Sequence, residues 1–185
     1  MKKLKIETER HNSLSPSKNH FLSLCSSIIY QQISTKAGDS IYNRFLKLFK
    51  NRKPTPKLLL NISDLKLRSA GLSPQKLSYI RDLSNKFLDK SIEAKQFDAM
   101  NNTEIKEHLI RVKGIGSWTA DMFLIFALNR QNVLPMGDLG IRNGFKKTFK
   151  LKNSPSETQM KRLSKPYEDE LTKFSIFLWS NLDKN

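Results

Sequence analysis

Hydrophobic side chains recur along this chain every three or four residues, which is the spacing of one face of an α-helix. In residues 34–50 the apolar positions are Ala37, Ile41, Phe45 and Leu48, and Lys or Arg occupies much of what lies between them. Such a stripe buries its apolar side in a core and leaves its basic side in water. We therefore expect an amphipathic helix over 34–50.

The same period returns in two further stretches, 75–90 and 168–182. No stretch alternates apolar and polar residues with Val, Ile and Thr over the length of a strand, so we expect no sheet. Prolines stand between the helical stretches, where they can start a helix or break the direction of the chain. The pattern predicts an all-α protein of about ten short helices.

The net charge of the chain indicates what kind of partner it binds. The chain has 185 residues, of which 33 are Lys or Arg and 17 are Asp or Glu, so its formal net charge is +16. With 38% hydrophobic residues it can still bury a core, either as one domain or as two small lobes. Because an excess of this size repels itself in the folded state, it favours a polyanionic partner. Nucleic acid is the first candidate, and an anionic membrane surface is the second.

Cysteine content and hydropathy exclude several classes of protein. The chain has one cysteine, Cys25, which excludes a disulfide framework, a four-cysteine zinc site and a four-cysteine iron–sulfur cluster within it. We interpret Cys25 as a buried helix residue rather than a nucleophile. No apolar run approaches the ~20 residues that a membrane span needs, and no hydrophobic region follows the basic start. We therefore expect a reducing, cytoplasmic compartment and no membrane partner.

A glycine pair marks the most informative segment, Arg111-Val-Lys-Gly-Ile-Gly-Ser-Trp-Thr-Ala. Gly114 and Gly116 flank one apolar residue and let two helices meet in a tight hairpin. They also let a phosphate approach bare backbone N–H groups at the start of the second helix, as in a helix-hairpin-helix. The alternative is a plain helix corner with no ligand. A dinucleotide-binding loop does not fit, because no strand precedes the segment and Thr119 replaces the third glycine.

Asp138 stands after Pro135 and Gly137 and before the helical stretch 139–149. Its ordinary role there is that of an N-cap, although Ile141 rather than Glu or Gln occupies the third helical position. A catalytic carboxylate is the alternative, and the two roles are compatible. A basic run follows, and it is either a solvated face or a flank of a DNA channel; its members are Lys146, Lys147, Lys150, Lys152, Lys161, Arg162 and Lys165.

Taken together, the segments 114–124 (GIGSWTADMFL) and 134–140 (LPMGDLG) resemble the helix-hairpin-helix DNA glycosylases, most closely the DNA-3-methyladenine glycosylases of the type II, alkylation-repair kind. The resemblance extends upstream to 28–37 (IIYQQISTKA) and 67–76 (LRSAGLSPQK), and downstream to Lys165-Pro-Tyr and Trp179. It covers about residues 20–182 in one unbroken order.

The resemblance implies a fold of two helical lobes with the active site in the cleft between them. Lobe one would run from about 35 to 130, and lobe two would combine about 1–34 with 131–185. It also implies a DNA repair enzyme that flips a damaged base out of the duplex and hydrolyses its N-glycosidic bond, leaving an abasic site.

Residue roles follow from the same resemblance. Asp138 matches the catalytic carboxylate, which stabilises positive charge on the deoxyribose. Relatives that also nick the strand carry a lysine where this chain has Trp118, so the resemblance implies a monofunctional enzyme with water as nucleophile. Trp118 and Trp179 match aromatic residues of the base pocket, where an indole face suits a cationic purine, and Met122 would lie beside them. From spacing alone, the better interpretation of both tryptophans would be that they are core residues.

DNA-binding residues are implied in the same way. Gln32, with Gln31 beside it, matches the wedge that fills the vacated stack, although two polar residues before the N-cap Ser34 would need no function. The phosphate-binding hairpin would use Gly114, Gly116 and Ser117. Backbone carbonyls of the same hairpin would bind a structural Na⁺ or K⁺, namely those of Ile110, Val112 and Ile115. No other cofactor, and no iron–sulfur cluster, is expected.

The substrate expected from the resemblance is duplex DNA that contains alkylated purines such as 3-methyladenine or 7-methylguanine. The alternatives are a related glycosylase for another damaged base and a protein that binds distorted DNA without cutting it. We expect a monomer that passes its product to an abasic-site endonuclease. Its location would be the cytoplasm, with the nucleoid, in a prokaryote, or the nucleus in a eukaryote.

Overall fold

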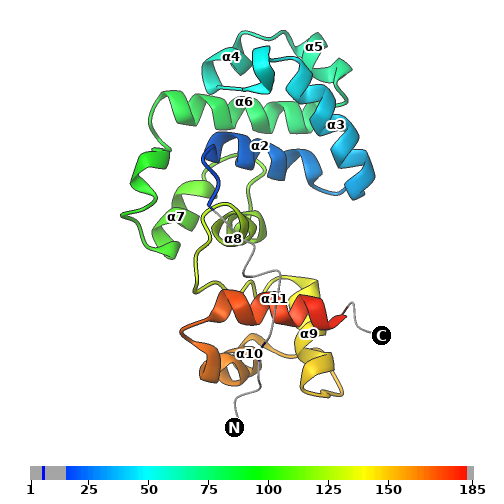
Figure 1. Cartoon of the computed structure of the whole chain (residues 1–185), viewed down its shortest axis with the longest axis vertical. Coiled ribbons are helices and arrows are strands. Elements are labelled where there is room, and N and C mark those ends of the chain that lie inside the picture. The colour runs from blue at the N-terminus through cyan, green and yellow to red at the C-terminus, as the bar shows by residue number, and fades with distance from the viewer. Residues whose placement is uncertain (1–5, 7–15, 183–185) are drawn as a thin grey trace. The chain divides into compact units, whose positions relative to one another are not determined.

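The computed structural model describes Ile6 and residues 16–182, and in these residues all regular structure is helical (Figure 1). The expected all-α class is therefore confirmed for the described part of the chain. No helix of that part is both long and apolar enough to cross a membrane.

The chain forms two compact units. The middle unit consists of residues 17–123, and the described residues of the C-terminal unit are Ile6, Pro16 and 124–182. The middle unit contains α2 (His20–Tyr30), α3 (Thr35–Lys47), η1 (Lys50–Arg52), α4 (Pro56–Leu60), α5 (Asp64–Ser69), α6 (Pro74–Leu88), η2 (Ala94–Gln96), α7 (Asn102–Leu109) and most of α8 (Ser117–Phe126). The C-terminal unit contains α9 (Leu139–Thr148), α10 (Glu157–Ser164), η3 (Lys165–Tyr167) and α11 (Leu171–Leu182).

Side-chain caps explain where most of these helices begin. The first turn of a helix has backbone N–H groups with no partner inside the helix, and a Ser, Thr, Asn or Asp oxygen can accept from one of them. Ser34, for example, accepts from the Ala37 N–H, which confirms it as an N-cap. At α7 the cap is reciprocal, because Asn101 accepts from Glu104 while the Glu104 side chain accepts from the Asn101 N–H.

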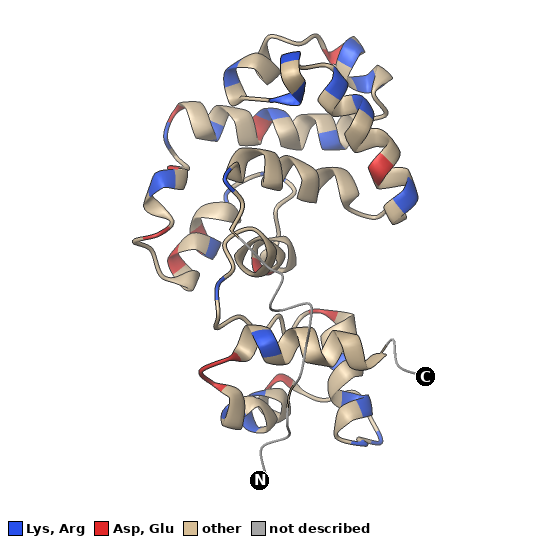
Figure 2. Ribbon diagram, viewed as in Figure 1, with Lys and Arg blue, Asp and Glu red and all other residues tan. Residues whose placement is uncertain are grey.

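The core of the middle unit forms around α2, which packs against both α3 and α6. Leu24, Cys25, Ile28 and Ile29 of α2 are completely buried. The helix carries no Lys, Arg, Asp or Glu, and Figure 2 shows it without a charged position among helices that carry many. The interpretation of Cys25 as a buried helix residue is confirmed.

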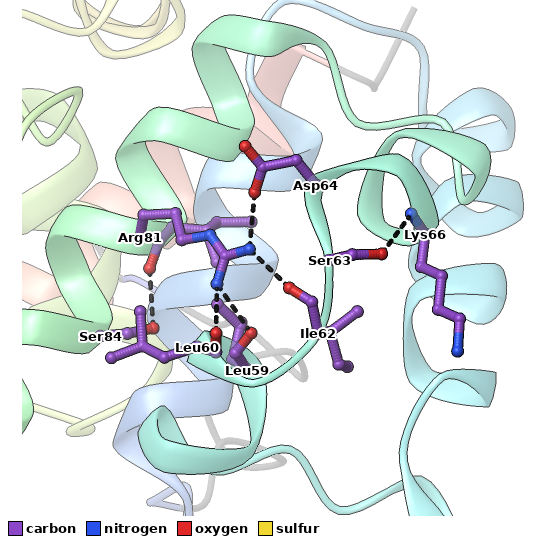
Figure 3. Close-up of polar contacts among 9 residues, drawn as sticks. Leu59, Leu60, Ile62, Ser63, Asp64, Lys66, Arg81 and Ser84 are labelled. Atoms are coloured by element: carbon purple, nitrogen blue, oxygen red, sulfur yellow. Dashed lines mark hydrogen bonds and ion pairs between the residues drawn. The ribbon is translucent and has the colours of Figure 1, made fainter.

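One arginine holds the corner between α4 and α5. The Arg81 guanidinium donates to the carbonyls of Leu59 (3.0 Å), Leu60 (2.9 Å) and Ile62 (2.5 Å) and pairs with Asp64 at 2.6 Å (Figure 3). The last carbonyls of a helix lack partners inside it, and one side chain of α6 donates to the last two carbonyls of α4.

The C-terminal unit has a core of its own. Phe145 from α9 and Phe174 from α11 meet there edge to face, and Tyr167 stacks on Phe174 with ring centres 4.1 Å apart. Gly144 lets α9 approach α11, because a Cβ at this position would lie 2.7 Å from the Leu178 carbonyl oxygen. Ile6 is buried in the same cluster, although it lies far from these helices in sequence.

The division into units differs from the expected lobes at both boundaries. Residues 17–34 lie with the middle of the chain rather than with its C-terminal part, because α2 buries its apolar face against α3 and α6. Residues 124–130 lie with the C-terminal unit instead of the middle one. Lobe two was also expected to include residues 1–15, and all of these except Ile6 lie outside the described residues. The cleft between the lobes stays a prediction.

Candidate functional site

The glycine segment forms the expected hairpin between α7 and α8. Gly114 has φ +78°, a conformation that favours glycine, and the Tyr79 ring lies against the space where its Cβ would be. Gly116 faces open space. Val112 and Ile115 are buried beneath the turn, so apolar packing holds the loop while its glycines stay accessible.

Two side chains from outside the hairpin hold its backbone. Asp82 of α6 accepts from the Lys113 N–H at 2.8 Å, and Gln31, just after α2, donates from Nε2 to the Gly114 carbonyl at 2.8 Å. Both contacts satisfy backbone groups that the turn leaves without partners. The loop is therefore fixed before any ligand arrives.

A partly buried ion pair joins the two arms of the hairpin. Lys106 of α7 contacts Asp121 of α8 at 2.8 Å, and Asp121 is 7% exposed. Burial raises the pKa of the Asp121 carboxyl from its ordinary value, and the neighbouring Lys106 opposes this rise.

The hairpin leaves donors and acceptors open on its backbone. No described residue accepts from the N–H of Gly114 or Gly116, and these groups lie at the start of α8, where the helix dipole attracts an anion. The carbonyls of Ile110 and Ile115 likewise receive no donor from the described residues, while that of Val112 accepts from the Ile115 N–H at 3.1 Å. A phosphate and a monovalent cation therefore both fit the loop's chemistry.

Asp138 is the N-cap of α9, as its position predicted. Its Oδ1 accepts from the Ile141 N–H at 2.7 Å and from the Trp179 indole N–H at 2.8 Å. Two donors on one oxygen hold the carboxylate in a single orientation. The capping contact and the indole contact thus act on the same carboxylate oxygen.

The hydrogen bond from Trp179 to Asp138 was not predicted from the sequence. The half-buried indole comes from α11 and stacks on Phe126, with ring centres 6.0 Å apart. Gly140 makes the approach possible, because a Cβ there would lie 2.9 Å from both Asp138 Oδ1 and Trp179 Cδ1. No local pattern signals the contact, since 41 residues separate its partners.

A cavity of about 470 Å³ lies in the middle unit beside the hairpin. Trp118 and Met122, one turn apart on α8, both line it, so the structure brings these two predicted pocket residues together. Trp118 is 49% exposed, which distinguishes it from a core tryptophan. Trp179 belongs to the other unit and does not line this cavity.

Two further residues of the cavity were not among the predicted site residues. Tyr79 of α6 presents its ring, and its hydroxyl accepts from Gln75 at 2.7 Å. Lys76, also of α6, donates from Nζ to the Ile29 carbonyl at 2.7 Å, and burial lowers the pKa of its ammonium group. The sequence did not single out Tyr79 and Lys76, because the helical spacing of α6 places them among its polar, solvent-facing positions.

The structure distinguishes the two glutamines expected at the wedge. Gln32 is exposed in the turn between α2 and α3 and has φ +57°, an uncommon conformation for a residue with a side chain. The Gln31 amide is instead turned to the hairpin, where Nε2 donates to the Gly114 carbonyl and to Thr119 Oγ1 at 3.3 Å. This difference favours Gln32 as the wedge.

The basic run lies on the surface of the C-terminal unit. All seven members, from Lys146 to Lys165, are exposed, and Figure 2 shows basic positions at the end of α9 and on α10. Among the described residues no group of three or more His, Cys, Asp or Glu side chains could hold a metal ion.

Comparison with known proteins gives a consistent result. Residues 25–169 match the model of the HhH-GPD superfamily of base excision DNA repair proteins. DNA-3-methyladenine glycosylase 1 of Schizosaccharomyces pombe is 31% identical over 172 residues, which cover 92% of this chain and 75% of that protein.

Two solved structures are similar over most of the chain. A DNA-3-methyladenine glycosidase from Bacillus halodurans is 32% identical with a TM-score of 0.86, and the match covers 93% of this chain and 79% of that one. The 3-methyladenine DNA glycosylase of S. pombe in complex with abasic DNA is 28% identical with a TM-score of 0.81, over 97% of this chain and 86% of that one.

Proposed function

The chain belongs to the HhH-GPD superfamily of base excision DNA repair proteins, and we propose that it excises alkylated purines of the 3-methyladenine and 7-methylguanine type from duplex DNA. The relatives from S. pombe and B. halodurans are named for 3-methyladenine excision. The observation that carries the proposal is the Asp138 carboxylate, held by a backbone N–H and an indole N–H at the start of α9.

The reaction is a hydrolysis at C1′ of the deoxyribose. The N-glycosidic bond breaks and its electron pair leaves with the base, which neutralises the charge that alkylation placed on the ring. A water oxygen bonds to C1′, and the proton that this water loses passes to Asp138 or to solvent. Because the alkylated base already carries a positive charge, it leaves without a strong general acid, and the abasic sugar is the second product.

Asp138 acts on the charge that develops in this step. As the glycosidic bond lengthens, positive charge grows on the sugar, and a fixed carboxylate stabilises it without reorganising. One preorganised group of this kind is worth about 3–4 kcal/mol. The resemblance places Trp118 at the position of the lysine that strand-nicking relatives carry. This position therefore supplies no amine for a Schiff base, which supports a monofunctional enzyme.

The middle unit supplies the groups expected to hold the DNA. The open N–H groups of Gly114 and Gly116, with Ser117 at the start of α8, would bind a backbone phosphate. Gln32 would fill the space that the flipped nucleotide leaves. The carbonyls of the hairpin, those of Ile110, Val112 and Ile115, would hold Na⁺ or K⁺, which would neutralise charge near that phosphate.

Base release from methylated duplex DNA tests the proposal, with the freed bases identified by chromatography. The wild-type protein should release 3-methyladenine or 7-methylguanine, and Asp138→Asn should lower the rate at least ~100-fold. Asparagine still caps α9, so the variant keeps its fold. Asp169→Asn is the matched control, because it makes the same change at an exposed position of the same unit.

The alternatives are outcomes of the same assay. If neither alkylpurine is released but other lesions are, the protein is a glycosylase of different base preference. If nothing is released while distorted DNA is bound tightly, the function is recognition without excision. An active protein should work as a monomer and pass its abasic product to an abasic-site endonuclease.

A further inference from the structure

The Gln31 amide, at the edge of the cavity in the middle unit, has a defined orientation. Its Nε2 lies 2.8 Å from the Gly114 carbonyl oxygen, which can only accept a hydrogen bond. The reversed amide would place two acceptors against each other, so the contact assigns the nitrogen to the hairpin side. The second hydrogen of Nε2 reaches Thr119 Oγ1 at 3.3 Å.

The other end of this amide is therefore an acceptor and nothing else. Both hydrogens of Gln31 are used, and no described residue donates to its Oε1. Oε1 is also not sealed from solvent, since the buried polar atoms without partners in the described residues are one nitrogen each of His20 and His108. Gln31 lines the cavity together with Trp118 and Tyr79, whose rings supply apolar walls.

We propose that Gln31 Oε1 is a specificity-determining acceptor that selects 6-amino purines, such as 3-methyladenine, over 6-oxo purines, such as 7-methylguanine and hypoxanthine. The inference rests on the proposed function, and it adds which alkylated base that function prefers. Volume does not make this selection, because about 470 Å³ admits any of these bases.

Hydrogen-bond chemistry makes the distinction. The amino group of adenine donates, and methylation of the ring spreads positive charge onto it, so its bond to a carbonyl oxygen becomes charge-assisted. A 6-oxo group in the same place would oppose one acceptor to another and leave both without a partner. Sites built around such a bond reject the analogue that cannot form it more strongly than apolar pockets reject a change of size.

Lys76 is the polar group of the cavity that argues for the opposite preference. Its ammonium can only donate, and it would favour a 6-oxo base. One of its hydrogens is already committed to the Ile29 carbonyl at 2.7 Å, which holds it against the end of α2. A cation is also poorly suited to a base that is itself cationic. The two residues therefore make opposing predictions that variants can separate.

The experiment compares excision of 3-methyladenine and 7-methylguanine by the full chain, as the ratio of their kcat/KM values. Gln31→Met keeps the length of the side chain and removes the acceptor. It should lower the ratio roughly 10- to 100-fold, the range for loss of one hydrogen bond to a charged group. Differences in the spontaneous loss of the two bases cancel when variant and wild type are compared.

Thr119→Val is the matched control. It removes the second partner of Nε2 but leaves Oε1 and the Gly114 contact in place, so it should change both rates by the same factor. If Gln31→Met also changes both rates equally, Gln31 only holds the hairpin and the inference is overturned. The same follows if the wild type prefers 7-methylguanine and Lys76→Met removes that preference.

Binding of the free bases provides a readout that does not depend on turnover. Quenching of tryptophan fluorescence should show 3-methyladenine binding weakened about tenfold or more in Gln31→Met, with 7-methylguanine unchanged. Equal weakening of both would contradict the inference while excision by the wild type still supported the proposed function. A wild type that releases neither base would instead remove the proposed function, and the inference with it.

Discussion

At the scale of single residues, Asp138 combines a structural contact with the catalytic role that we propose for it. Its Oδ1 caps α9 through the Ile141 N–H and receives the Trp179 indole N–H on the same atom. A carboxylate held in this way loses little freedom when charge develops nearby, which is the condition for electrostatic catalysis. The tryptophan is thus a positioning residue for Asp138.

Trp179→Phe tests this role. The variant keeps the aromatic ring that stacks on Phe126 but loses the N–H, so kcat should fall about tenfold, the effect of one hydrogen bond to a charged group. The KM for methylated DNA should not change, because the lost contact holds Asp138 and not the substrate. Single-turnover and steady-state kinetics would measure both. A loss of equal size in Phe126→Leu, which keeps the N–H, would show that stacking matters instead.

The sequence predicted single residues well where their role is local. Asp138 and Ser34 were recognisable as caps because a cap acts within three residues of itself. The partnership of Asp138 with Trp179 joins two helices that are distant in sequence, and the separate roles of Gln31 and Gln32 depend on a turn with φ +57°. Such features follow from packing, which residue spacing does not encode.

At the scale of elements, Arg81 of α6 holds α4 and the following loop through three backbone carbonyls, and α5 through the Asp64 carboxylate. Arg81→Met should lower the free energy of unfolding by about 2 kcal/mol, because three carbonyls lose charged donors and recover only part of that loss from water. Chemical denaturation would measure the change. Lys57→Met makes a similar replacement at an exposed position of α4 and should leave stability within ~0.5 kcal/mol. A similar loss in both variants would contradict the role of Arg81.

The ion pair within the hairpin gives a pH dependence. Because burial raises the pKa of Asp121 above its ordinary 3.8, this carboxyl favours the folded state only while protonated, and the benefit is lost as pH rises from about 3.8 through the raised value. Asp121→Asn stays neutral. Its free energy of unfolding should therefore equal that of the wild type in acid and exceed it at neutral pH, as measured by denaturation at a series of pH values.

Asp89 provides a control with the opposite sign. Hydrogen bonds from Ser91 lower the pKa of the Asp89 carboxyl, so its charged form favours folding above pH 3.8 and that benefit disappears as pH falls. Asp89→Asn should be less stable than the wild type at neutral pH and equal to it in acid. A neutral-pH loss of stability in Asp121→Asn would show that the contact with Lys106 outweighs the cost of burial.

Long, periodic helices were predictable as elements, and short ones were not. The expected stretches 75–90 and 139–149 correspond to α6 and α9, and 168–182 corresponds to α11. The stretch 34–50 was too long at its end, because α3 stops at Lys47 and the chain enters η1 with Asn51 at φ +57°. Helices such as α4, of five residues, are too short to show a period.

At the scale of the whole molecule, the sequence did not show which of the two units α2 belongs to. A helix without charged residues must be buried, but nothing in its composition says against which neighbours. The resemblance to known glycosylases suggested a lobe boundary near residue 35, whereas α2 packs with α3 and α6. Which distant segments share a core depends on how whole helices fit one another.

The charge of +16 belongs to this scale as well. Affinity for undamaged duplex DNA should fall linearly on a plot of log K against log salt concentration, as expected when Lys and Arg displace counterions from phosphates. Replacing Lys146 and Lys147 together by Gln should reduce the slope by about two, one for each lost phosphate contact. Fluorescence anisotropy at several salt concentrations would measure it. An unchanged slope would show that the end of α9 does not contact DNA.

The order in which the chain is made has a bearing on the two cores. Residues 17–123 are contiguous, so the middle unit can close as soon as it has left the ribosome, in keeping with the tendency of domains to fold as units during synthesis. Ile6 precedes residues 17–123 in the sequence, yet it belongs to the core of Phe145 and Phe174, which follow them. The core of the C-terminal unit therefore cannot close until residues on both sides of the middle unit have been made, and the C-terminal unit should become resistant to proteases later than the middle unit.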